Sequence, residues 1–348
     1  MSSTAPSLRD LAKKLGLSHT TVSEALRDNP RVKPETRNRV HAVAEAAGYH
    51  YNPLAGALMS EMRRSRTTSF RGVIAIVDLD GPKGRPPAAA RYHRDLTKGA
   101  IERAGELGFK AELFIVGHDG MTPQRLDTIL HSRGIRAVFL LPVSESPDVT
   151  KLNWARYAGI YTDYVIEHPA LHNICPNHYR AMLMAMQNLQ ALGYRRPGLV
   201  LQEHHDVRLF HRWEAAYWTH QNYYNPDKTN IPVLIPPEIE RISFSKWFKK
   251  YNPDVVLCHH AEAIEWMRAC GAKIPQTHGF CCLNTMMNPD VACAGLNLQP
   301  RLLGARGIEL VIGQLYRNEY GIPDLPSTTT VPALWVDGLT VRRITPKK

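Results

Sequence analysis

The stretch SLRDLAKKLGLSHTTVSEAL, Ser7–Leu26, decides the fold of the N-terminal part of this chain. Ser7 is a helix N-cap, and Asp10, three residues later, can reach back to it, which makes a capping box. Gly16 ends the first predicted helix and Ser18 caps a second one. Two short helices joined through a glycine turn predict a helix-turn-helix, whose second helix enters the major groove of DNA.

The second predicted helix has an inner and an outer face. Val22, Ala25 and Leu26 recur at helical spacing and predict the face that packs inward. Two short amphipathic helices also occur in many cores that bind no DNA, so this pattern alone does not decide the function. The predicted DNA-contacting residues of the N-cap and the outer face are Ser18, His19, Thr20, Thr21, Ser23, Glu24 and Arg27.

The distribution of charge supports a nucleic-acid partner. The whole chain has a formal net charge of +11, and residues 1–68 hold eleven Lys and Arg against six Asp and Glu, a net of +5. Nearly half of the positive excess therefore lies in a fifth of the chain, which is typical of a domain that contacts phosphates. A merely solvated basic face would be the alternative without the helix-turn-helix beneath it.

The rest of the N-terminal part contains two more predicted helices. The first spans Pro34–Ala47 and is ended by Gly48. Asn52 caps another, Pro53 to about Met59, which at two turns would be marginal alone in water. We therefore expect a DNA-binding domain over residues 1–50, followed by a short helix and linker over residues 51–68.

From Arg71 onward strands alternate with helices. Gly72–Val77 is rich in β-branched residues and predicts a strand, and Asp95–Leu107 predicts a helix. The alternation restarts near residue 178, so we expect two α/β halves with parallel sheets. Gly81–Arg91, with three prolines and two glycines, predicts a loop at a strand end. Ligands in such sheets bind beyond the carboxyl ends of the strands.

Composition narrows the class of protein. A length of 348 residues suits two or three domains, and no apolar run approaches the ~18 residues of a membrane span. The first residues lack the basic head and apolar run of a signal peptide, so we expect a cytoplasmic protein. The six cysteines have no C-x-x-C spacing, and Cys258-His259-His260 with Cys281-Cys282 matches no structural zinc pattern. We predict no metal and no cofactor.

The order of residues in the N-terminal part resembles that of the LacI/GalR family of bacterial repressors. The resemblance rests on L-x-D-L-A-x-x-L-G-L-S-x-x-T-V-S over residues 8–23, V-x-x-x-T-R-x-x-V over 32–40 and G-Y at 48–49. It implies a homodimer on double-stranded operator DNA, with Leu58 of the short hinge helix inserted into the minor groove. In two positions the chain departs from the family: Gly56 and Glu24 stand where basic residues are common.

The resemblance also implies a two-lobed effector domain of the periplasmic-binding-protein type over residues 69–345. Its N-lobe would span about 69–163 and 296–328, and its C-lobe about 164–295 and 329–345. The implied effector-binding residues are Tyr92, His93, Asp163, Arg212, His259, His260 and Asn284. Among them, Arg212 would grip ligand oxygens through its planar fork, and Asn284 would replace an acid that the family has and this chain lacks.

The sequence thus predicts a DNA-binding transcriptional regulator, a repressor, controlled by a small sugar-like effector. It contains no G-x-S-x-G, no G-x-x-x-x-G-K and no H-E-x-x-H motif, and we do not expect an enzyme. Two alternatives stay open. One is a DNA-binding regulator whose cleft no longer senses a ligand, and the other is an enzyme of the same α/β architecture.

Overall fold

The computed structural model describes residues 8–26, 29–47, 71–81, 85–225 and 230–344. The chain forms two compact units, Met1–Ser69 and Phe70–Lys348. The expected hinge helix over Pro53–Met59 lies outside the described residues. No helix in the described part of the chain is long and apolar enough to cross a membrane.

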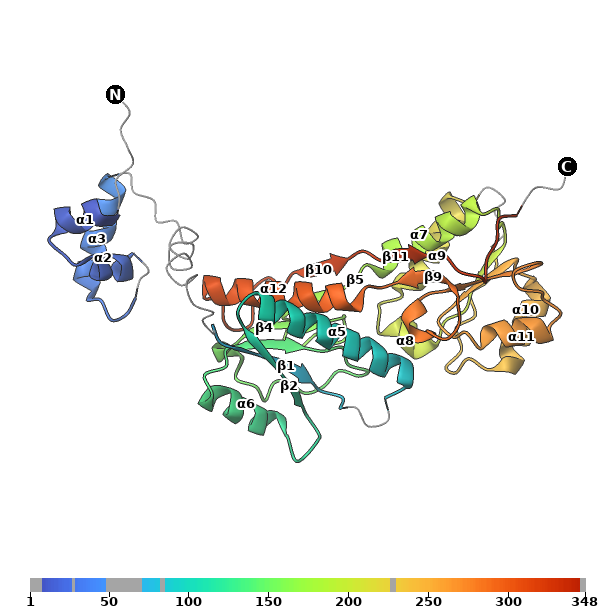
Figure 1. Ribbon diagram of the computed structural model, residues 1–348, viewed down its shortest axis with the longest axis horizontal. Helices are drawn as coiled ribbons and strands as arrows, with labels where there is room; N and C mark the ends of the chain where they lie inside the picture. Colours follow the sequence, from blue (N-terminus) through green and yellow to red (C-terminus); the bar gives the residue numbers. More distant parts are fainter. Residues whose placement is uncertain (1–7, 27–28, 48–70, 82–84, 226–229, 345–348) are drawn as a thin grey trace, which may run out of the picture. The chain divides into compact units, whose positions relative to one another are not determined.

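In residues 8–26 and 29–47, the N-terminal unit is a bundle of the helices α1 (Leu8–Leu15), α2 (His19–Ala25) and α3 (Pro34–Ala46) (Figure 1). Gly16 has a φ of +65°, a left-handed conformation that glycine adopts without steric cost, and it ends α1 as expected. Its small core is made of one or more apolar residues from each helix. They are Leu11, Ala12, Val22, Ala25, Leu26, Val32, Val40 and Ala44.

The second unit contains two sheets. The first, which with its helices we name the N-lobe, has six parallel strands in the order β10-β5-β4-β3-β1-β2. The strands span Val73–Asp78 (β1), Lys110–Ile115 (β2), Ala137–Leu140 (β3), Ala158–Thr162 (β4), His172–Pro176 (β5) and Thr328–Val331 (β10).

Helices cover both faces of the N-lobe sheet. Ile74 and Ile76 of β1 pack in a core with α5 (Pro87–Glu106) and α12 (Pro300–Arg317), whereas Ala75 and Val77 pack in the core that contains α6 (Pro123–Ser132). Burial on both faces explains why this strand is continuously apolar. In Figure 1, α5 and α12 run side by side. A Cβ on Gly304 would lie 2.0 Å from the Leu96 carbonyl oxygen, so glycine permits this close approach.

The second sheet, which with its helices we name the C-lobe, has the order β11-β9-β8-β7-β6. Its strands span Pro197–Leu199 (β6), Val255–Cys258 (β7), Gly279–Cys282 (β8), Ala294–Asn297 (β9) and Leu334–Val336 (β11). The edge strand β11 is antiparallel to β9, and the others pair in parallel. The helices are α7 (His178–Ala191), α8 (Glu203–Val207), α9 (Arg212–Tyr223), α10 (Arg241–Tyr251) and α11 (Ala263–Ala269).

The predicted α/β class with mainly parallel sheets is confirmed, but the lobe boundaries differ from the expectation, and the one expected at residue 296 falls inside β9 of the C-lobe sheet. The first crossover follows β5 at Pro176 and not Asp163, because after β4 the chain turns and adds β5 to the same sheet. The last crossover follows Val331 and not residue 328, because β10 pairs with β5 in the N-lobe. Both strands are short, and they pair with each other across more than 150 residues of sequence.

The predicted loop over Gly81–Arg91 is also longer than the observed one. Helix α5 begins at Pro87, eight residues before the expected start at Asp95. Proline is favoured at the first helical position because its φ is fixed and its missing N–H would be unpaired there. Three alanines, the strongest helix formers, follow it. Tyr92 and His93 therefore lie on a helix and not at the end of a loop.

Candidate functional site

The predicted recognition helix α2 has the N-cap that the sequence predicts. The Ser18 side chain accepts a hydrogen bond from the Thr21 backbone N–H at 3.0 Å, and its Oγ lies 2.8 Å from Thr21 Oγ1. Thr20 is exposed, and Ser23 and Glu24 are half-buried. The inner face is buried as expected, with Val22 fully buried against α1 and α3. This packing presents the N-terminal turn of α2 to solvent, where a base edge or phosphate can reach it.

Other predicted DNA contacts are less fully described. His19 is the first residue of α2, and its backbone position agrees with the expectation. Arg27 and Leu58 lie outside the described residues. The orientation of α2 is fixed in part from α3, where His41 Nε2 lies 3.2 Å from the Ala25 carbonyl oxygen.

A cavity of about 430 Å³ lies between the N-lobe and the C-lobe. Much of its polar lining follows the carboxyl ends of strands in both sheets, where α/β folds hold their ligands, and Tyr92 and His93 are added from α5. Five of the seven predicted effector-binding residues line it. They are Tyr92, His93, Asp163, His259 and Asn284.

The other two predicted residues do not line the cavity. The guanidinium of Arg212 lies 4.1 Å from the centre of the Tyr164 ring, in a cation–π contact. Between α8 and α9, Phe210 and His211 both adopt left-handed backbone angles. Because of this turn, Arg212 is the first residue of α9 and lies beside the Tyr164 ring. His260 directs its backbone N–H to Cys258 Sγ at 3.4 Å.

Arg208, which the sequence analysis missed, lines the cavity. It follows α8 of the C-lobe and reaches the N-lobe, where Nη2 donates to Asp163 Oδ2 at 3.1 Å and Nη1 donates to the Val143 carbonyl oxygen at 3.2 Å. Burial raises the pKa of Asp163, and the positive charge of Arg208 opposes that increase. The Arg208–Asp163 pair therefore links the two lobes at the cavity wall.

Four histidines line the cavity as neutral imidazoles. Burial lowers the pKa of His93 to about 4, with Arg85 contributing, and lowers that of His178 to about 3. Burial also holds the pKa values of His205 and His259 well below the ordinary value. A neutral imidazole carries one donor and one acceptor nitrogen, so the lining can both give and accept hydrogen bonds.

Several buried polar atoms of the lining have no hydrogen-bond partner among the described residues. They are His93 Nδ1, Asp163 Oδ1, His178 Nδ1, Arg208 Nε and His259 Nε2. Buried polar groups are normally paired, because an unpaired one loses its hydration without compensation. A bound polar molecule would supply these missing partners.

The cations of the described lining already face carboxylates. Arg85 makes a bidentate pair with Asp78, at 2.7 Å and 2.9 Å, and Arg208 pairs with Asp163. Asp80 accepts a hydrogen bond from the Ser144 backbone at 2.6 Å. The cavity therefore presents hydrogen-bonding groups and paired charges, together with the aromatic side chain of Tyr92.

The cavity residues that the sequence analysis missed share one feature of sequence: each closely follows a strand. Arg85, His178, His205 and Arg208 each follow a strand within about ten residues, in loops or helix starts on the carboxyl side of the sheets. The run Glu203-His204-His205-Asp206 after β6 is the clearest example. Searching every strand end for polar residues, and not only the family positions, would have found them.

Comparisons with known proteins agree with this architecture. The model of bacterial regulatory proteins of the lacI family matches residues 7–52. The maltose regulon regulatory protein MalI of Vibrio furnissii is 32% identical over 109 residues, which are 31% of this chain and 69% of MalI. The chain belongs to the LacI family.

Longer alignments within the family are more distant. The sucrose operon repressor of Shigella flexneri is 25% identical over 200 residues, 55% of this chain and 54% of the repressor, so the match spans about half the length of that relative. The lac repressor dimer, solved with operator and an anti-inducer, superposes with a TM-score of 0.52 at 15% identity, over 97% of this chain and 99% of that one. This likeness supports the LacI-family fold for both units.

Proposed function

We propose that this LacI-family chain is a transcriptional repressor that binds operator DNA through α2 and releases or holds it according to a small molecule bound between the two lobes. The observation that carries the proposal is the cavity of about 430 Å³ whose buried polar atoms lack partners, in the same chain as a capped helix-turn-helix. The relatives support it, because they include repressors and regulators of sucrose and maltose operons and regulons.

The proposed effector is an uncharged molecule with several hydroxyl groups, such as a sugar. Hydroxyls both donate and accept, which suits neutral histidines, and a sugar ring can pack on Tyr92. A phosphate or carboxylate ligand is disfavoured, because Arg85 and Arg208 already pair with acids. The proposed site comprises Tyr92, His93, Asp163, His259 and Asn284, with Arg208 added.

The proposal includes a homodimer in the cytoplasm on a roughly palindromic operator. One helix-turn-helix contacts one half-site, so two-fold DNA symmetry calls for two copies of the chain. The lac repressor structure was solved as a dimer on its operator, which supports the same assembly here.

Replacing Gly56, in the predicted hinge helix, by alanine should tighten operator binding, because alanine favours the helix.

A thermal-shift screen tests the ligand part of the proposal. Neutral mono- and disaccharides are compared with sugar phosphates and sugar acids, and a ligand that binds the folded state raises the melting temperature. We expect stabilisation by a neutral sugar only. Stabilisation by the phosphates or acids alone would contradict the uncharged class, and no stabilisation by any compound would favour a cleft that no longer senses a ligand.

A further inference from the structure

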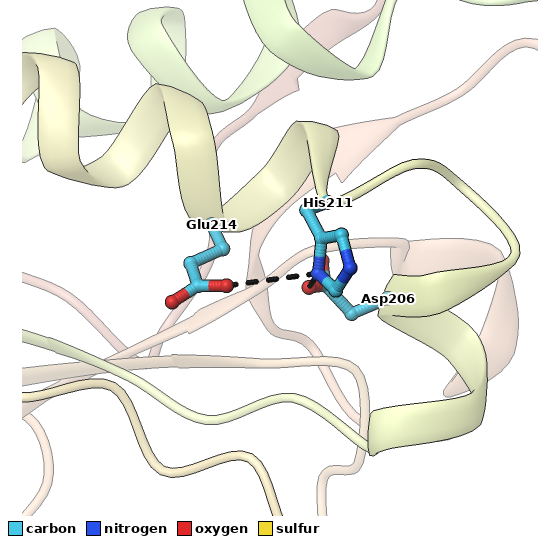
Figure 2. Close-up of side chains that lie close together, drawn as sticks. All are labelled: Asp206, His211 and Glu214. Carbon is cyan, nitrogen blue, oxygen red and sulfur yellow. Dashed lines mark hydrogen bonds and ion pairs between the residues drawn. The ribbon is translucent and has the colours of Figure 1, made fainter.

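A second polar cluster lies outside the cavity, at the turn between α8 and α9 (Figure 2). Asp206 belongs to α8, His211 precedes α9, and Glu214 lies in the first turn of α9. His211 Nδ1 lies 2.8 Å from Asp206 Oδ2 and 3.7 Å from Glu214 Oε2. We propose that these three side chains bind one divalent transition-metal ion of the zinc class.

The charge of the cluster suits a cation. Figure 2 shows the carboxylates of Asp206 and Glu214 directed toward the same nitrogen of His211. In the part of the chain that the structure describes, His211 is the basic partner of both carboxylates, and no lysine or arginine forms an ion pair with either. Two acids and one imidazole would give a divalent ion a nearly neutral site.

An unpartnered buried atom points independently to a ligand. Asp206 is fully buried, and its Oδ1 has no hydrogen-bond partner among the described residues. A buried carboxylate oxygen without a donor is unfavourable, and a metal ion at this point would pair it.

The geometry is close to that of a bound ion. The three ligand atoms lie within 4.8 Å of one another. Zinc bonds of about 2.0–2.2 Å to nitrogen and oxygen require tetrahedral ligand atoms roughly 3.4 Å apart. The His211–Asp206 separation would therefore widen and the His211–Glu214 separation would shorten slightly. His211 can move to allow this, because 58% of its side chain is exposed.

The donor set selects the class of ion. One imidazole nitrogen with two carboxylate oxygens suits zinc, cobalt or manganese, whereas calcium takes oxygen ligands. Trp218 Nε1 donates to Glu214 Oε1 at 3.2 Å, an outer contact of the kind that orients a ligating carboxylate. The spacing D-x-x-x-x-H-x-x-E matches no common zinc pattern, so this cluster is recognisable only in the folded structure.

A metal ion here would act on the effector cavity through Arg208. Arg208 lies between Asp206 and His211 in the chain, and its guanidinium joins the lobes at Asp163 and Val143. Cross-linking both sides of the turn by an ion would hold Arg208 in that position. The site is thus a candidate for a second control on the same cleft, independent of the organic ligand.

The experiment uses the full-length, untagged chain after removal of metals with a chelator. Cobalt is titrated by visible absorption, and zinc by calorimetry. We expect one ion per chain and at least a tenfold weaker affinity in His211→Asn, where asparagine tolerates the left-handed backbone of His211. Glu214→Gln, which keeps an oxygen for Trp218, should also bind more weakly. The matched control is His204→Asn, which changes an exposed histidine on α8, the helix that carries Asp206, and should bind as wild type does.

Two results would overturn the proposal. One is a wild-type chain that binds no cobalt or zinc ion, and the other is equal affinity in wild type and His211→Asn. Tryptophan fluorescence shows that each variant is folded, because all six tryptophans lie between residues 154 and 335. If His211→Asn fails to fold, the comparison of Glu214→Gln with His204→Asn decides in the same way.

Discussion

The helix-turn-helix and the effector cavity differ in how locally they are built. The cap, the inner face and the outer face of α2 all come from residues 18–26, whereas the cavity collects side chains from residue 80 to residue 303. Local chemistry is therefore sufficient for the first, and tertiary packing determines the second. The DNA-binding surface therefore depends on one short run of sequence, whereas the polar groups of the cavity come from many separate segments.

The largest expected effect comes from a substitution in the core of the helix-turn-helix. Val22→Asp places an unpaired carboxylate in a fully buried position, which costs several kcal/mol. We expect the bundle of α1, α2 and α3 to unfold and operator affinity in a gel-shift assay to fall by more than about a hundredfold, equivalent to about 2.8 kcal/mol. Tryptophan fluorescence of the second unit should be unchanged.

The control adds the same charge at an exposed position. Ala42→Asp lies on the exposed side of α3 and should retain most of the operator affinity. Equal affinities of Val22→Asp and Ala42→Asp would show that the core around Val22 is not what holds α2 in place.

The next prediction distinguishes the roles of Arg208 and Arg212. Arg208→Ala removes hydrogen bonds to a charged partner, worth about 1.5–3 kcal/mol, and should weaken effector binding by roughly ten- to a hundredfold. Arg212→Ala removes a cation–π contact of about 1 kcal/mol and should lower stability with little change in effector affinity. Calorimetry with the sugar found in the screen measures both. If Arg212→Ala weakened effector binding and Arg208→Ala did not, Arg212 would be the effector-binding arginine, as predicted from the sequence.

An intermediate effect concerns pH and the buried histidines. In the folded state the pKa of His93 is lowered to about 4, so this histidine is neutral while the unfolded chain takes up a proton below about 6.5. The unfolded state then binds more protons, and stability falls as the pH falls from 6.5 toward 4, by about 1.4 kcal/mol per unit for one such histidine. Urea unfolding followed by tryptophan fluorescence measures this slope. His93→Gln should reduce it, and an unchanged slope would count against a neutral His93.

The smallest effect concerns sequence preference. Glu24 is half-buried on the outer side of α2, and a carboxylate there can accept from the amino group of cytosine but cannot bind phosphate favourably. Glu24→Ala should change the preferred operator bases by about 1–3 kcal/mol of discrimination and leave non-specific binding nearly the same. Selection of sites from a random DNA pool is the measurement. The same preferred motif for both proteins would remove Glu24 from the base-contacting residues.

How much could be predicted from the sequence follows the same division. The two ends of α1 and the start of α2 were predicted closely, because caps and glycines are local signals. The start of α5 was missed because three prolines suggested a loop. The role predicted for Arg212 in effector binding stays a prediction: a left-handed turn at Phe210 and His211 places its guanidinium over the Tyr164 ring, while Arg208 lines the cavity. That turn carries no local pattern, and only the packed structure reveals it.

The central claim is that one ligand in the cavity controls one DNA-binding surface. The direct test is the affinity of the full-length chain for its selected operator, measured with and without a saturating amount of the sugar found by thermal shift. Coupling between two sites is typically worth about 1–3 kcal/mol, so we predict a change in operator Kd of at least fivefold, which Arg208→Ala should reduce. An operator Kd that is the same with and without a sugar that demonstrably binds the cavity would contradict the account.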